Sequence, residues 1–142
     1  MLKTKLTAED VKAEVHRFWN SFQAKATASL SDMYAPEATV FSSVSNRVEP
    51  GRLAAARRHR EYFHAKSTIR ASVSNIDVVM LGENAAVASY NFMFHATKVA
   101  GGVSGGHDED IKQGRASHVF MSDMDGKLRI VHEHFSTVDK PA

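Results

Sequence analysis

Apolar residues recur at helical spacing near the start of the chain. The apolar positions there are Val11, Val15, Phe18 and Phe22. They follow one another at intervals of four, three and four residues, which places them on one face of a helix. Thr7 is suited to cap this helix, and Glu9 and Asp10 would lie in its first turn, where the helix dipole favours negative charge. The pattern predicts an amphipathic helix over residues 7–26.

The next segment changes character several times. Residues 26–38 predict a short second helix that ends at Pro36, because the residue before a proline avoids the helical region. Residues 39–44 (TVFSSV) predict a short strand, and residues 46–51 (NRVEPG) predict a turn. A third helix is expected over residues 51–66 (GRLAAARRHREYFHAK).

Long stretches typical of strands fill the second half. The four expected strands span residues 68–81, 85–99, 110–121 and 128–138. Short turn sequences, GEN and DMDGK, join the first and last pairs, and a glycine-rich loop over 101–110 joins the middle pair. Helices followed by an antiparallel meander indicate an α+β fold, with the helices packed on one face of a curved sheet. No linker interrupts the pattern, so residues 1–142 are expected to form one domain.

The composition excludes several classes of protein. Hydrophobic residues make up 43% and charged residues 24% of the 142 residues, as in ordinary globular proteins. The net charge of +2 gives no reason to expect a nucleic-acid partner or an anionic membrane. There is no cysteine, which excludes disulfides, thiolate metal sites and cysteine nucleophiles. The first fifteen residues lack a long apolar segment, so a cytoplasmic protein without a membrane span is expected.

Several phrases resemble those of a known family. LGENAAVASYNF, AGGVSGG, SHVF, DGKLRIVHEHFS and MYAPEATVFSS are similar to phrases of the SnoaL-like branch of the nuclear transport factor 2-like superfamily. Within that branch they resemble the association (hub) domain of calcium/calmodulin-dependent protein kinase II, over roughly residues 7–138. The resemblance implies a cone-shaped α+β fold with a curved, mixed but mainly antiparallel sheet. It also implies a cavity between sheet and helices, and an outer sheet face that supports homodimers or larger homo-oligomers.

The resemblance further implies which positions would meet a ligand. Hub domains bind small carboxylates through arginines on three strands, and those positions fall on Phe92, His118 and Phe135 here. Two aromatic residues and a histidine in place of three arginines argue against carboxylate binding of that type. Trp19 stands near the place where ketosteroid isomerases carry a tyrosine on the first helix, so their pattern is not evident either. Trp19 is expected to line the cavity, or simply to belong to the core.

The phrase HEHFS near the end of the chain carries most of the candidate chemistry. Side chains alternate along a strand, so His132 and His134 share one face and Glu133 and Phe135 share the other. A two-residue loop at Asp125-Gly126 would place Glu133 opposite His118 and Phe135 opposite Ala116. The same register places His134 opposite Ser117 and Arg115 opposite Ser136. A bulge in the turn would shift every pair by one residue.

The histidine pair raises the possibility of a metal site. His132 and His134 could chelate one ion, but a site needs a third ligand and no second ligand motif is present. His107 and the acidic residues after it are conceivable donors at the far end of a loop. We therefore expect no metal and no cofactor, and interpret the pair as a hydrogen-bonded strand end.

The pair His118 and Glu133 suggests acid–base chemistry. A carboxylate opposite an imidazole orients the ring and raises its basicity, so His118 would act as base and Glu133 as its orienting partner. Tyr90 or His59 would donate a hydrogen bond to a developing oxyanion. The structural alternative, which we favour, is a cross-strand pair that stabilises the hairpin.

Other polar residues leave two interpretations each. Arg115, which shares a face with His132 and His134, would clamp an anionic group or lie in a dimer interface. The arginines of RRHREYFH suggest nucleic acid but are better explained as a solvated helix surface. His59 on the same helix would point into the cavity or be a core histidine.

These observations favour one function and leave an alternative. The first is a homodimeric protein that binds a small, largely apolar molecule in its cone, with an isomerase or cyclase as the enzymatic version. The alternative is a non-catalytic association module whose sheet face builds an oligomer.

Overall fold

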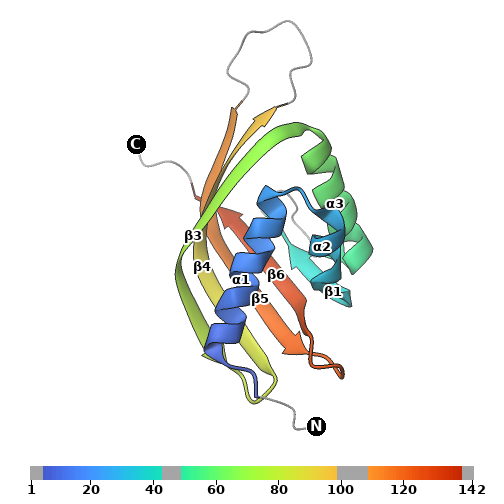
Figure 1. Ribbon diagram of the computed structural model, residues 1–142, viewed down its shortest axis with the longest axis vertical. Helices are drawn as coiled ribbons and strands as arrows, with labels where there is room; N and C mark the ends of the chain where they lie inside the picture. The colour runs from blue at the N-terminus through green and yellow to red at the C-terminus, as the bar shows by residue number, and fades with distance from the viewer. Residues whose placement is uncertain (1–4, 43–48, 99–108, 139–142) are drawn as a thin grey trace, which may run out of the picture.

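One curved sheet with helices on a single side forms the molecule (Figure 1). The computed structural model describes residues 5–42, 49–98 and 109–138. The helices are α1 (Ala8–Gln23), α2 (Thr27–Asp32) and α3 (Arg52–His64). The strands are β1 (Tyr34–Phe41), β2 (Glu49–Pro50), β3 (Lys66–Met80), β4 (Ala85–Lys98), β5 (Glu109–Ser122) and β6 (Leu128–Thr137). The α+β class and the cone-like packing predicted from the sequence are confirmed.

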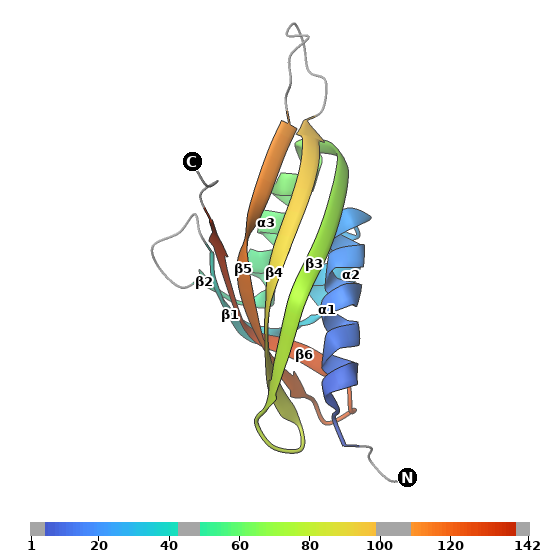
Figure 2. The same cartoon turned by 90° about the vertical axis from the view of Figure 1, so that its left-hand side faces the viewer.

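The sheet is mixed. Its strand order is β2-β1-β6-β5-β4-β3, in which β3 to β6 form the predicted antiparallel meander and β1 pairs in parallel with β6. The side of the sheet that faces the viewer in Figure 2 carries no helix in the described residues, and all three helices lie behind it. We call this side the outer face. No helix among the described residues has the length and apolar content needed to cross a membrane.

Helix α1 packs across the inner face of the sheet through the predicted stripe. Thr7 and Asp10 cap it reciprocally: each side chain accepts a hydrogen bond from the other residue's backbone N–H. The stripe residues are all buried, and Trp19 is buried with them. The helix ends at Gln23, three residues before the predicted end, where Lys25 adopts a positive φ of 55°.

The prediction for residues 26–44 was partly wrong. Helix α2 ends at Asp32, and the strand begins at Tyr34 and runs through Pro36. Tertiary pairing explains the difference, because Ile130 N–H donates to Met33 O at 2.7 Å and Tyr34 pairs with Ile130. Pairing with β6 is interrupted between Tyr34 and Thr39, so the missing N–H of Pro36 removes no bond from that ladder. The last predicted strand residues, 43 and 44, lie outside the described residues.

The connection between β5 and β6 contains two irregularities that cancel. The turn holds three residues, Met124–Gly126, and not the two expected, with Gly126 at a φ of 82°. That change shifts the pairing by one residue next to the turn. A bulge at Val131 shifts it back, since Phe120 pairs with Ile130 but Val119 pairs with His132. The predicted pairing of Glu133 with His118, and of the three pairs beyond it, is therefore confirmed.

Two local features accompany the curvature of the sheet. Asn75 adopts a positive φ of 56° at an irregularity in β3, where the register against β4 changes. Gly114 in β5 lies against β6 so closely that a Cβ atom would overlap the carbonyl oxygen of Ser136 and lie 2.9 Å from Cα of Thr137. Only glycine fits that contact. The loop expected over 101–110 lies outside the described residues, apart from the last two, which begin β5.

Gly114→Ala is expected to lower the free energy of unfolding by about 3 kcal/mol, because the new methyl group meets backbone atoms that cannot rotate away. Urea denaturation followed by circular dichroism measures the change. Ser117→Ala on the same strand is the control and should change stability by less than about 0.5 kcal/mol. Equal stability of Gly114→Ala and the wild type would contradict the close approach of β5 and β6.

Candidate functional site

An aromatic pocket of about 230 Å³ lies between the inner face of the sheet and the helices. Its aromatic lining consists of Phe18, Trp19, Phe22, Tyr62, Phe92, Phe94 and Phe135. Its polar lining consists of Ser42, Arg58, His59, Lys112, Glu133 and Thr137. A larger groove of about 530 Å³ near Asp10, Glu83 and Leu128 contains no member of the buried polar network described below. The aromatic pocket is therefore the candidate site.

The aromatic side chains of the pocket contact one another across three elements. Trp19 of α1 stacks on Phe92 of β4 with ring centroids 5.3 Å apart. Phe92 in turn stacks on Phe94 at 6.1 Å and meets the ring of Phe135 edge-on at 5.5 Å. Alternation along β4 places Phe92 and Phe94 on the same face, so the helix and two strands supply one continuous apolar wall.

Glu133 is the charged group at the centre of the site. Its side chain is almost fully buried, yet it lines the pocket. Tyr34 O–H donates to Oε2 at 2.6 Å, and His118 Nε2 lies 2.8 Å from the same oxygen. Burial alone would raise the pKa of Glu133, but the hydrogen bond from His118, together with that from Tyr34, outweighs burial and lowers it. The carboxylate is therefore held ionised inside an apolar environment.

A chain of hydrogen bonds extends from Glu133 to α1. Trp19 Nε1–H donates to the Tyr90 hydroxyl at 2.8 Å, and that hydroxyl lies 3.3 Å from His118 Nδ1. Indole has a donor and no acceptor, so Tyr90 accepts from Trp19 and directs its own proton toward His118. His118 then accepts at Nδ1 and donates from Nε2 to Glu133. This neutral tautomer satisfies every group in the chain. Burial raises the pKa of Tyr90 well above its usual value, so the phenol keeps its proton.

The predicted site residues divide into those that line the pocket and those behind it. Glu133, Phe92, Phe135, Trp19 and His59 line it. His118 and Tyr90 are buried and are not part of the lining. Both ring nitrogens of His118 have partners, so a molecule in the pocket would meet the carboxylate and not the imidazole.

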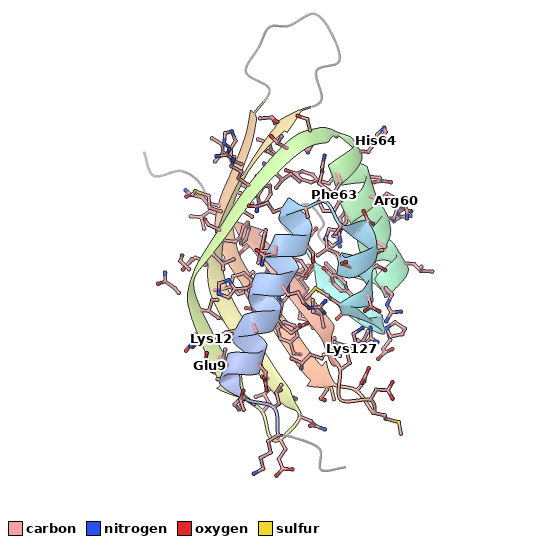
Figure 3. The ribbon with its side chains drawn as sticks, viewed as in Figure 1. Glu9, Lys12, Arg60, Phe63, His64 and Lys127 are labelled. Carbon is pink, nitrogen blue, oxygen red and sulfur yellow. The ribbon has the colours of Figure 1, made fainter. Side chains whose placement is uncertain are left out.

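His59 projects from α3 into the same region. Its ring stacks on Phe63 at 5.9 Å and meets Phe18 edge-on at 6.2 Å. Its Nδ1 atom is buried and has no hydrogen-bond partner among the residues that the structure describes. Burial, together with the positive charge of Arg58, lowers the pKa of His59 to about 4, against the opposing effect of Glu133. The imidazole is therefore neutral near pH 7. Figure 3 shows Phe63 on the inner side of α3 and Arg60 and His64 directed outward.

Three predicted ligand-binding residues lie on the outer face, away from the aromatic pocket. Arg115 is exposed opposite Ser136. His132 Nδ1 lies 2.7 Å from the Thr39 hydroxyl, and His134 is exposed with its ring 5.3 Å from that of Phe41. Alternation explains this placement, because all three have the opposite parity to the inward-facing residues of their strands.

The described residues contain no cluster of three or more histidine, aspartate or glutamate side chains suited to a metal ion. His107, which was considered as a donor, lies outside them.

Sequence reasoning placed His59 of α3 in the site, but it missed the contribution of Arg58 on the same helix and the role of Tyr34 in β1. Tyr34 was placed in a helix, so its bond to Glu133 was not foreseen. Arg58 was interpreted as part of a solvated surface, but it lines the pocket. The buried phenol of Tyr34 follows from the parallel pairing of β1 with β6, which leaves no local pattern in the sequence.

Structural comparison places the chain among solved domains of one fold. A candidate calcium/calmodulin dependent protein kinase II association domain from Xanthomonas campestris has a TM-score of 0.77 and 20% identity, with 99% of each chain covered. A candidate dehydratase of the NTF2-like family from Streptomyces avermitilis has a TM-score of 0.79 and 16% identity, covering 93% of this chain and 96% of the other. The association domain of Caenorhabditis elegans CaMKII has a TM-score of 0.69 and 19% identity, covering 91% and 94%. These likenesses show the fold.

Sequence comparison defines the family more closely. No match was found among curated proteins. The family model of the calcium/calmodulin dependent protein kinase II association domain matches residues 7–139, which include every element described above. With nearly the whole chain matched and the fold shared, this protein belongs to the calcium/calmodulin dependent protein kinase II association domain family.

Proposed function

We propose that this protein binds a small, largely apolar ring compound in the aromatic pocket. The observation that carries the proposal is an apolar pocket with one ionised carboxylate in its wall. A volume of about 230 Å³ exceeds the roughly 150 Å³ of an apolar cavity known to accept benzene, so one ring with a substituent fits. The stacked rings of Trp19 and Phe92 offer flat faces to such a ligand.

Any proton transfer in the pocket would use Glu133 as the group that meets the ligand. His118 would act as a positioning residue, because both of its nitrogens are engaged within the buried chain. In this proposal Glu133 takes the role of the base and His118 that of its positioning partner, which is the reverse of the roles suggested by the sequence. Tyr90 would position His118 in the same way, which leaves His59 as the other polar residue proposed from the sequence for the reaction that lines the pocket.

Binding of a one-ring compound such as benzyl alcohol is expected to raise the melting temperature and to weaken at least tenfold in Phe135→Trp, because the larger indole occupies the ligand volume. Isothermal titration calorimetry measures the affinity. Met93→Trp on the outer face is the matched control and should bind as the wild type does. Unchanged affinity in Phe135→Trp would show that the ring binds elsewhere.

The neutral state of His59 has a consequence for stability. In the unfolded chain the imidazole takes up a proton below about pH 6.5, whereas in the folded protein it does so only near pH 4. The unfolded state therefore binds more protons between these values, and stability falls as the pH falls through that window. From pH 7 to pH 5 the free energy of unfolding of the wild type should fall by about 2 kcal/mol because of His59. His59→Gln should not show this decrease.

Urea denaturation at the two pH values tests this expectation. His134→Gln, which alters an exposed histidine on the outer face, should lose stability as the wild type does. Equal pH dependence of the wild type and His59→Gln would contradict a buried, neutral imidazole.

Self-association is the second candidate function, favoured by the family and by the outer face. The association domain from C. elegans shares this fold. The exposed apolar side chains of Met93 on β4 and Ile111 on β5 are diagonal neighbours on the outer face, since Ile111 pairs with His95. An unpartnered apolar surface on a sheet is a common site for a second copy of the same chain. Arg115 lies on the same face of β5 and would contribute to this interface.

Ile111→Glu and Arg115→Glu are each expected to shift a homo-oligomer toward monomer. Ile111→Glu would bury a carboxylate without a partner, and Arg115→Glu would reverse the charge that Arg115 brings to the interface. Light scattering after size-exclusion chromatography measures the mass. Leu53→Glu, a change to an exposed side chain on α3, is the control and should leave the mass unchanged. An unaltered oligomer in both variants would place the interface elsewhere.

A further inference from the structure

The carboxylate of Glu133 has unused hydrogen-bonding capacity. Both hydrogen bonds that it accepts, from Tyr34 and from His118, end on Oε2. Oε1 accepts none from the residues that the structure describes. A carboxylate offers about four acceptor sites and no donor, and Glu133 is part of the pocket lining. The free oxygen therefore presents an acceptor to whatever occupies the pocket.

We propose that the ligand is a neutral ring compound with a hydroxyl group, whose O–H donates to Oε1 of Glu133. This inference rests on the proposed function, since it concerns the same pocket. It adds a chemical class: neutral donors are selected over carboxylates, amines and plain hydrocarbons.

The charges around the pocket exclude anions first. A ligand carboxylate would lie beside the ionised Glu133 within apolar walls, where like charges repel more strongly than in water. Neither carboxylate could donate a hydrogen bond to the other. Phe92 and Phe135 carry no charge, and the two cationic side chains of the lining compensate little, because Lys112 lies 3.5 Å from Asp110 and Arg58 has a partner of its own.

Cations are disfavoured for a different reason. The negative charge of Glu133 is already stabilised by two donors, and a guanidinium, that of Arg58, lines the same pocket. Lys112 adds a second positive group, although it lies 3.5 Å from Asp110 and is partly compensated. An ammonium ion would therefore lose its water shell without gaining an unpaired counter-charge.

A hydroxyl group meets the remaining requirement. Its proton forms a charge-assisted bond to Oε1, which is stronger than a bond between neutral groups. Its oxygen can also accept a hydrogen bond, and His59 has a buried Nδ1 without a partner in the described part of the chain. A site built around such a bond rejects analogues that lack the hydroxyl, because the buried carboxylate oxygen is then left unsatisfied.

Calorimetry with four one-ring probes of similar size tests the inference: benzyl alcohol, toluene, benzoate and benzylamine at pH 7. Benzyl alcohol is expected to bind the wild type at least tenfold more tightly than each of the others. In Glu133→Gln the preference for benzyl alcohol over benzoate should fall below threefold, because the negative charge is gone. His134→Gln on the outer face is the matched control and should keep the wild-type order.

The wild-type panel decides the matter even where Glu133→Gln fails to fold. Benzoate or benzylamine binding as tightly as benzyl alcohol would overturn the inference and leave the proposed ring-binding function standing. Toluene binding as tightly as benzyl alcohol would do the same, and would indicate that Oε1 keeps a water molecule. Failure of all four probes to bind would overturn the proposed function together with the inference.

Discussion

The structure depends on the need to stabilise one buried negative charge. Glu133 is removed from water by the helices above it, and an unpaired carboxylate in that position would be costly. Tyr34 and His118 supply the donors that make its burial tolerable. They come from β1 and β5, the two neighbours of β6, so the parallel pair and the antiparallel pair are both required. The same interaction thus joins the three central strands and engages one oxygen of a carboxylate that lines the pocket.

Backbone irregularities keep that interaction in register. The extra residue in the turn between β5 and β6 would move Glu133 to the outer face, and the bulge at Val131 restores it to the inner one. The close approach at Gly114 brings β5 and β6 together farther along the same pair, beside Phe92 of β4. Deviations from a regular ladder therefore place the functional side chains.

Local pattern was sufficient for the parts of the fold with strong periodicity. The apolar stripe of α1 and the alternation in β3 to β6 predicted these elements. The pairing of His118 with Glu133 followed from the assumed turn and from the alternation of side chains. It was correct because the longer turn and the bulge at Val131, neither of which was foreseen, cancel each other. The first part of β1, which contains Tyr34, was missed because its conformation is imposed by pairing with β6 and not by its own residues. The position of Arg58 in the pocket lining was missed because helical periodicity alone does not show how α3 is rotated about its axis relative to the sheet.

Trp19 joins the two halves of the site, because its ring forms part of the pocket wall while its N–H begins the buried chain that leads to Glu133. It is also the sole tryptophan of the sequence. Ultraviolet emission excited at the indole band therefore originates from one known position, in the wall of the aromatic pocket. The fluorescence of Trp19 should therefore change when a ligand enters the aromatic pocket or when the hydrogen-bond chain to Glu133 is broken, and no added dye is needed.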